Sequence, residues 1–186
     1  MGSRGASSGR GGAITSASMA KIMNETEKIR NAKKENLIVF DKNGNILYTE
    51  GGTLSHTGYG NADDFYKDSI SVHNHPKGVA PFPSDTDFDT FQNKGIDTMV
   101  IVSPDYTITV KADPNYSGVK SSISKNMQYT GFRDADNALR KLRQSGQITQ
   151  KEYNQKRREI KFKYQAEACK RSGYTMTVEP TGKKKK

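Results

Sequence analysis

The stretch SVHNHPKGVAPFPSDTDFDTF, residues 71–91, contains two histidines, two serines, three aspartates and three prolines. Its first residues predict a strand that ends at Pro76, because proline cannot donate to a sheet ladder. Residues two apart on a strand point to the same face, so we expect His73 and His75 to project together. A loop over 77–83 then leads to a helix with Ser84 as its N-cap.

The spacing between Ser84 and Asp87 has two interpretations. Ser-x-x-Asp resembles a capping box with Asp in place of Glu, which requires no chemistry. Alternatively, the loop returns Asp87 toward the strand, where its carboxylate joins the two imidazoles around a metal ion. Two histidines and one carboxylate with an open fourth position are typical of catalytic zinc. Each half of the stretch taken alone favours a structural role, whereas the combined spacing favours a metal site.

The segments around this stretch predict a mixed sheet flanked by helices. Apolar periodicity and turn residues indicate the following elements: an amphipathic helix over 18–34, a hairpin over 36–50, a short helical turn over 63–67, a helix over 84–94 ended by Gly95, and a hairpin over 98–113 that turns at Pro104 and Asp105. This pattern predicts an α/β or α+β sandwich over residues 18–112.

The remainder of the chain differs in composition. Residues 1–17 predict a flexible Gly/Ser/Arg arm, residues 113–180 a basic helical extension, and residues 181–186 a Lys tail. Within the extension we expect helices over 134–145 and 149–173, the second with a packing stripe of Tyr153, Ile160, Tyr164 and Ala168, and a last strand over 174–180.

The net charge of +10 is unevenly distributed. Residues 1–113 contain 12 Lys/Arg against 14 Asp/Glu, and residues 114–186 contain 18 against 6. Such a field attracts nucleic acid, although a solvated helix face explains it equally well. The candidate phosphate contacts are Arg140, Lys141, Arg143, Lys156, Arg157, Arg158, Lys161 and Lys163. The interleaved rings of Tyr153, Phe162 and Tyr164 are either stacking platforms or, as we favour, packing residues.

Composition also limits the cellular location and the cysteine chemistry that we expect for the protein. No apolar run approaches the roughly 20 residues that span a bilayer, and the myristoylation pattern fails at Ala6, so we expect a cytoplasmic chain without membrane contact or lipid anchor. Cys169 is the only cysteine, which rules out an intramolecular disulfide and a cysteine metal cage. We expect a buried or half-buried helical thiol there. His56 is expected to be a loop residue.

The combined pattern of His73, His75, Pro76, Ser84 and Asp87 resembles the signature of the JAB-domain (JAMM/MPN+) zinc metallopeptidases. HNHP is closest in appearance to bacterial RadC-like and phage-associated JAB proteins. The resemblance implies a JAB/MPN-like, cytidine deaminase-like layered sandwich over residues 18–112. It also implies that the protein comes from a bacterium, phage or mobile element and is located in the cytoplasm of the bacterial cell or of the infected host. It leaves the basic extension unexplained.

The same resemblance implies one Zn²⁺ per chain, held by His73, His75 and Asp87, and hydrolysis of a peptide or isopeptide bond in a peptide or protein substrate. Family members need a glutamate at the start of the first strand, which implies Glu35 as the general base, with Glu50 as the fallback. Ser84 would donate to the oxyanion.

Two other functions compete with the peptidase. The first is a nucleic-acid-associated module that uses the JAB fold as a scaffold for the basic extension. The second is an interaction or phage assembly protein whose metal site is structural and closed by a fourth protein ligand, for which the sequence offers Asp85, Asp89 or Glu35.

Overall fold

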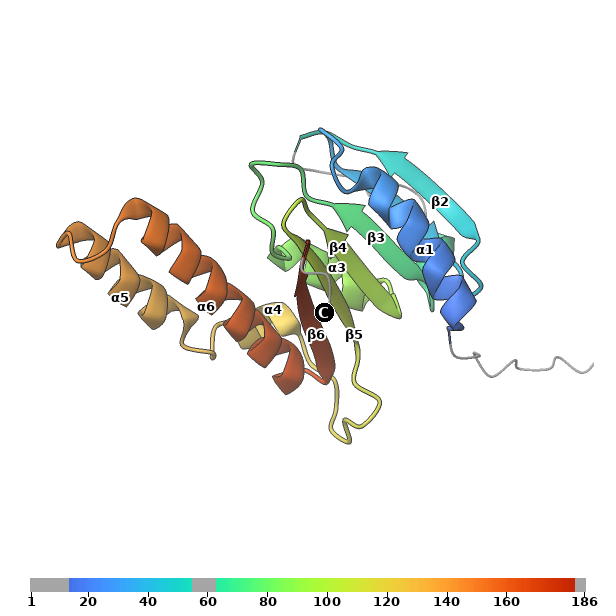
Figure 1. Cartoon of the computed structure of the whole chain (residues 1–186). Coiled ribbons are helices and arrows are strands. Elements are labelled where there is room, and N and C mark those ends of the chain that lie inside the picture. Colours follow the sequence, from blue (N-terminus) through green and yellow to red (C-terminus); the bar gives the residue numbers. More distant parts are fainter. Residues whose placement is uncertain (1–13, 55–62, 183–186) are drawn as a thin grey trace, which may run out of the picture.

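A computed structural model describes residues 14–54 and 63–182 of the chain (Figure 1). The arm at residues 1–13, His56 and the last four lysines lie outside the described residues. The flexible arm, the loop position of His56 and most of the Lys tail therefore stay predictions.

The fold is an α+β arrangement built on a six-stranded mixed sheet. In spatial order the strands are β2 (Ile46–Gly51), β1 (Asn36–Phe40), β3 (Ile70–Asn74), β4 (Thr98–Val102), β5 (Tyr106–Ala112) and β6 (Tyr174–Pro180). Neighbouring strands are antiparallel except β3 and β4, which are parallel and connected through α3 (Asp85–Asn93). The predicted mixed sheet, both hairpins and the last strand are confirmed.

Helices cover both faces of the sheet (Figure 1). On one face, α1 (Ser16–Ile29) packs Ile22 against the apolar side chains of Ile38, Phe40, Val72 and Val100. On the other face, the core cluster includes Leu37 and Ile101 from the strands, the α3 side chains Phe88 and Phe91, Ile123 from α4 (Ile123–Met127), and Ala168 and Cys169 from α6 (Gln150–Arg171). The central strands are buried on both faces, as their continuous apolar sequences require.

The boundaries of the first helix were predicted wrongly. The helix runs from Ser16 to Ile29, rather than from 18 to 34, because the Thr15 side chain accepts a hydrogen bond from Ser18 N and caps the first turn. At the other end, buried Arg30 donates to the carbonyl oxygens of Ser103 and Tyr106. These bonds anchor the segment after the helix to the β4–β5 turn.

The C-terminal segments form a helical hairpin, α5 (Phe132–Gln144) and α6, that projects from the sheet (Figure 1). Gly146 separates the two helices, as predicted, and adopts a positive φ of 75° that favours glycine. The short helices α2 (Asp63–Tyr66) and α4 complete the described elements. The sequence prediction missed α4, whose signal is the N-cap Ser122.

The helical extension is continuous with the sheet. β6 pairs with β5 along its whole length, from Tyr106 opposite Pro180 to Ala112 opposite Tyr174. The chain therefore returns from the hairpin to complete the sheet that carries the histidines. The proposed division into a domain at 18–112 and an extension at 113–180 stays a prediction.

Candidate metal centre

Strand β3 brings the two histidines to one end of the sheet. His73 is paired with Leu37 on β1 and with Ile101 on β4, so it lies in the interior of the sheet. His75 follows the strand, and its backbone nitrogen donates to Val102 O at 2.8 Å. Alternation along the strand directs both imidazoles to the face covered by α3, and both are buried.

Helix α3 supplies the carboxylate. Asp87 accepts hydrogen bonds through Oδ2 from Ser84 N at 2.6 Å and from Ser84 Oγ at 2.8 Å, and its own backbone nitrogen donates to Ser84 Oγ at 3.1 Å. This is a capping box that fixes the Asp87 side chain at the start of the helix. The capping role of Ser84 and Asp87 is therefore present, and it orients Asp87 toward the histidines.

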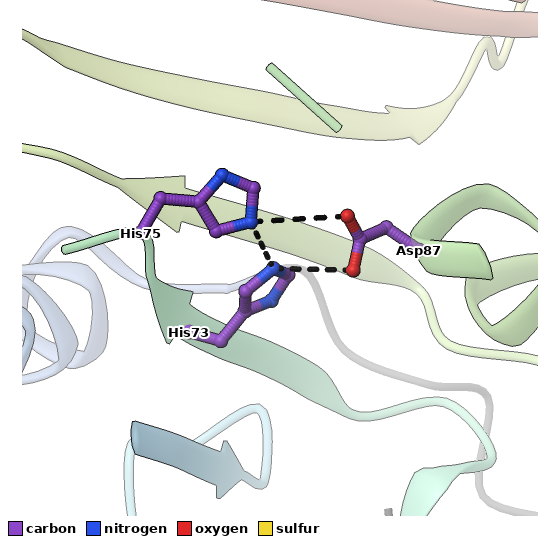
Figure 2. A group of neighbouring side chains, drawn as sticks. All are labelled: His73, His75 and Asp87. Carbon is purple, nitrogen blue, oxygen red and sulfur yellow. Dashed lines mark hydrogen bonds and ion pairs between the residues drawn. The ribbon is translucent and has the colours of Figure 1, made fainter. Parts of the chain in front are cut away.

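Figure 2 shows the three side chains pointing at one another from β3, the loop after it and α3. The two Nε2 atoms lie 3.2 Å apart. Asp87 Oδ1 is 3.3 Å from His73 Nε2, and Asp87 Oδ2 is 3.8 Å from His75 Nε2. One ligand atom from each residue lies within 4.8 Å of the other two, so the group could hold a metal ion.

These separations fit a small tetrahedral ion. Bonds of roughly 2.0–2.1 Å at tetrahedral angles place two ligand atoms about 3.3 Å apart. The distances of 3.2 and 3.3 Å match this value directly. The 3.8 Å distance between His75 and Asp87 involves the other carboxylate oxygen, so the Asp87 side chain would turn to present a single oxygen to both imidazoles. Two of the three ligand pairs thus already have tetrahedral spacing.

The hydrogen bond of His75 identifies its tautomer. Its Nδ1 lies 2.7 Å from the carbonyl oxygen of Ala80, which can only accept. Nδ1 therefore carries the hydrogen, and in the neutral ring Nε2 presents a lone pair to the cluster. Burial, followed by the adjacent His73, lowers the pKa of His75 to about 4, so the ring is neutral at pH 7.

The other two members of the cluster, His73 and Asp87, shift each other's pKa. Burial favours neutral His73, but the Asp87 carboxylate and, more weakly, Glu35 raise its pKa above the usual 6.5. Burial also opposes ionisation of Asp87, yet His73 and the Ser84 hydrogen bond lower its pKa well below 3.8. When His73 is protonated, its charge pairs with the Asp87 carboxylate as a bound cation would.

His73 retains an unsatisfied atom. Its Nδ1 is buried and has no hydrogen-bond partner among the described residues. Buried imidazole nitrogens are normally satisfied, and exceptions occur at sites with a functional constraint. The burial of this nitrogen therefore costs free energy that no hydrogen bond within the described residues offsets.

Glu35 and Glu50 lie at different distances from the histidines. Glu35 is buried directly before β1, the strand next to β3, and its charge acts on His73. Glu50 lies on β2, one strand further away, and accepts a hydrogen bond from the Tyr48 hydroxyl at 2.5 Å. Because adjacent strands are about 4.8 Å apart, the position of Glu35 favours it over Glu50 as the carboxylate that serves the cluster.

Helix α6 supports the loop between the ligands, which sequence reasoning did not predict. Buried Gln165 donates through Nε2 to the carbonyl oxygen of Pro83 at 2.7 Å. Phe162 packs edge-on against Phe82 and Tyr106, with ring centroids 5.5 and 5.0 Å apart. A glutamine within a charged helix gives no sequence signal of such a contact, because its partner is 82 residues away.

The basic residues proposed to contact phosphates are not all unpaired and exposed. Arg140 and Arg157 both donate to buried Asp136, at 3.1 and 2.9 Å. Lys161 is partly buried over the Phe132 ring. The remaining candidates at 141, 143, 156, 158 and 163 are exposed or half-exposed along α5 and α6.

The aromatic residues of α6 are packing residues, as favoured. Tyr153 is buried and its hydroxyl donates to Asp136 at 3.2 Å, and Tyr164 packs against Phe132. The predicted stripe was only partly right, because α6 buries Tyr153, Gln165, Ala168 and Cys169, while Ile160 and Tyr164 are half-buried. Cys169 is a buried thiol, as expected, and burial raises its pKa to about 12.

Comparison with known proteins gives no further assignment. No protein-family model matches the chain, and no curated protein has a significantly similar sequence. Within the described residues, no helix is both long and apolar enough to cross a membrane.

Proposed function

We propose that this protein is a zinc-dependent metallopeptidase of the JAB type, which hydrolyses a peptide or isopeptide bond. The observation that carries the proposal is the convergence of His73, His75 and Asp87, with the Nε2 lone pair of His75 held toward the other two ligand atoms. The HNHP motif and the mixed sheet agree with a JAB-like fold.

The number of candidate ligands favours a catalytic rather than a structural metal. Within the described residues, the candidate ligand group has three members, which leaves one tetrahedral position for water or substrate. Of the fourth ligands considered, Asp85 is exposed and Asp89 accepts a hydrogen bond from Ser124 Oγ at 2.8 Å. An assembly protein whose metal site is closed by Asp85 or Asp89 is therefore less well supported.

Zinc held by these residues would supply a Lewis acid that makes water a nucleophile at neutral pH. Glu35 would accept the proton of that water and return it to the leaving amine, because it is buried directly before β1, the strand next to β3. The Ser84 hydroxyl, which donates to Asp87 in this structure, would turn its hydrogen toward the developing oxyanion.

The first test removes metal from the purified full chain with a chelator, adds zinc back, and measures the zinc that stays bound after the excess is removed. We expect about one equivalent of zinc per chain, and Co²⁺ substitution should give the visible absorption of a tetrahedral site. His73→Ala should lose both signals, whereas Asp85→Ala, which changes an exposed aspartate on the same helix as Asp87, should keep them. Failure of the wild-type chain to bind zinc would remove the proposal.

The second test separates metal binding from catalysis. With a panel of quenched fluorogenic peptides, Glu35→Gln should reduce hydrolysis by about 100-fold while zinc stoichiometry is unchanged. Glu50→Gln is the matched control and should stay within about two-fold of wild type, since its carboxylate bonds to Tyr48. The opposite ranking would make Glu50 the base.

The alternative, a nucleic-acid-associated module, has weaker support. Two of its eight candidate cations are paired with Asp136, and the α6 rings that could stack on bases pack against other side chains. Binding through phosphates would weaken steeply with salt. Salt-independent binding, or no change when the exposed residues Lys141, Lys156 and Lys163 are replaced by Gln, would remove this alternative.

A further inference from the structure

A groove of about 1180 Å³ crosses the end of the sheet next to the candidate metal centre. Its lining comes from the loop at 76–82, the β4–β5 turn at 103–105, the segment at 31–33, Leu54, and three α6 residues, Asn154, Arg157 and Arg158. The basic helical extension is thus one wall of a cleft whose other walls belong to the sheet.

The groove and the candidate metal centre share the loop at 76–82. This loop begins directly after His75, and Ala80, a groove residue, accepts the hydrogen bond from His75 Nδ1 at 2.7 Å. The groove also lies where the parallel strands β3 and β4 end, and crevices at the carboxyl ends of parallel strands are common ligand sites. A molecule in the groove would therefore contact the segment that orients a metal ligand.

The lining carries an excess of positive charge. Lys33, Lys77, Arg157 and Arg158 contribute cations, and Asp105 is the one acidic side chain that lines it. Within the described parts of the chain, no ion pair engages Lys33, Lys77 or Arg158. Arg157 is anchored by its bond to Asp136. A groove with unpaired cations on several walls attracts a negatively charged ligand.

The other lining residues favour a polypeptide over a nucleic acid. Ala32, Leu54, Val79, Ala80 and Pro81 are small or aliphatic and suit amino-acid side chains. Proteins that bind single-stranded nucleic acid stack bases on exposed aromatic rings. The one aromatic residue of the lining, Phe82, packs edge-on against Phe162.

We propose that this groove binds an extended polypeptide with acidic and small apolar side chains, and that it selects such segments as substrates for the metal centre. The inference rests on the proposed function for its catalytic consequence, while binding in the groove can be measured without catalysis. Arg158 and Lys77 are the specificity-determining residues, since they line the groove from two different elements, α6 and the loop after β3, and have no ion-pair partner in the described structure.

The experiment measures fluorescence anisotropy with the full chain in excess chelator at low salt, so that no hydrolysis occurs. The probes are a short fluorescein-labelled peptide in which Glu alternates with Ala and Val, the same peptide with Lys in place of Glu, and a single-stranded oligonucleotide. The groove variant combines Lys77→Gln with Arg158→Gln. The matched control combines Lys156→Gln with Lys163→Gln, which removes the same charge from exposed positions outside the groove.

We expect the Glu peptide to bind more tightly than the other two probes. The groove variant should weaken its binding by about 5- to 10-fold, and the control by less than about two-fold. Matching circular dichroism and thermal melts will show that both variants are folded. No binding of the Glu peptide, equal binding by the groove and control variants, or tighter binding of the oligonucleotide would each overturn the inference.

The outcome is separable from that of the zinc test. If the chain binds zinc and hydrolyses peptides without preference for the Glu peptide, the groove inference fails and the proposed function stands. If the Glu peptide binds in the groove but the chain binds no zinc, the proposed function fails and the groove remains a peptide-binding site.

Discussion

The molecule contains two buried aspartates whose surroundings differ in kind. Asp136 in the helical hairpin is 8% exposed and bonds to Arg140, Arg157 and the Tyr153 hydroxyl. Asp87 at the end of the sheet is 13% exposed and faces two histidines. Both have a lowered pKa, so a depressed carboxyl pKa by itself does not identify a functional site.

The difference lies in what the partners can do. Arginine remains charged at every physiological pH and binds carboxylates through several fixed donors, so Asp136 is satisfied within the protein. Imidazole exchanges its proton and binds metals through a neutral nitrogen, and the cluster at Asp87 has two Nε2 atoms 3.2 Å apart. We therefore interpret Asp136 as structural and Asp87 as a candidate ligand.

The largest expected effect separates the two aspartates by metal affinity. Asp87→Asn should reduce zinc affinity by more than about 100-fold, since it replaces an anionic ligand with a neutral amide. Asp136→Asn should leave it within about two-fold. Competition with a chromophoric chelator at neutral pH measures both. Equal affinities for Asp87→Asn and wild type would end the distinction.

The second-largest effect concerns stability, which, unlike zinc affinity, is expected to depend on Asp136. Asp136→Ala should lower the free energy of unfolding by about 2 kcal/mol, because it leaves two arginines and a buried hydroxyl without their acceptor. Urea denaturation measures this change. Glu159→Ala, which removes an exposed carboxylate from α6, is the control and should cost less than about 0.5 kcal/mol. A cost for Asp136→Ala as small as that of Glu159→Ala would contradict the structural interpretation.

A smaller effect is expected at the contact between α6 and the loop that precedes α3. Gln165→Leu should destabilise the chain by about 1 kcal/mol, because the carbonyl oxygen of Pro83 loses its buried donor. The same change should weaken zinc binding several-fold, since it loosens the loop that carries Ser84 to the cluster. Gln155→Leu, at an exposed position on α6, is the control. Unchanged zinc affinity in Gln165→Leu would show that α6 does not position the site.

The smallest effect is the pH dependence of the Asp136 contribution. Its pKa is lowered in the folded chain, against burial, by the hydrogen bonds and charges of Arg157 and Arg140, so its stabilisation is complete above the unfolded pKa of about 3.8. It is lost as the pH falls through the folded pKa. The stability difference between wild type and Asp136→Ala should thus be constant from pH 7 to 5 and narrow in acid. A difference that widens in acid would contradict the assignment.

Much of the fold could be predicted from local sequence. Strand β3 ends before Pro76, α3 begins after Ser84, and the hairpin at β4–β5 turns at Pro104 and Asp105, because each of these residues restricts its own backbone or caps its own helix. The end of α1 was predicted wrongly because the tertiary bonds of Arg30 act on that segment. Hydrophobic periodicity contains no information about such distant partners.

The candidate site was predictable to the extent that its residues are close in sequence. His73, His75 and Asp87 lie within 15 residues, and strand alternation with a helix start brings them together. The choice between Glu35 and Glu50 was not predictable in this way, because it depends on the order β2-β1-β3 in the sheet. Nothing in the sequence indicated that α6 would line the groove beside the candidate metal centre.

The sequence by itself determined the strand, loop and helix that carry the three candidate ligands, because proline, serine and side-chain alternation act within a few residues. Only the tertiary structure decided the tautomer of His75, the proximity of Glu35, and the contact of Gln165 with Pro83. These features depend on burial and on hydrogen bonds between distant segments. Such contacts exist only after the sheet has brought its strands together.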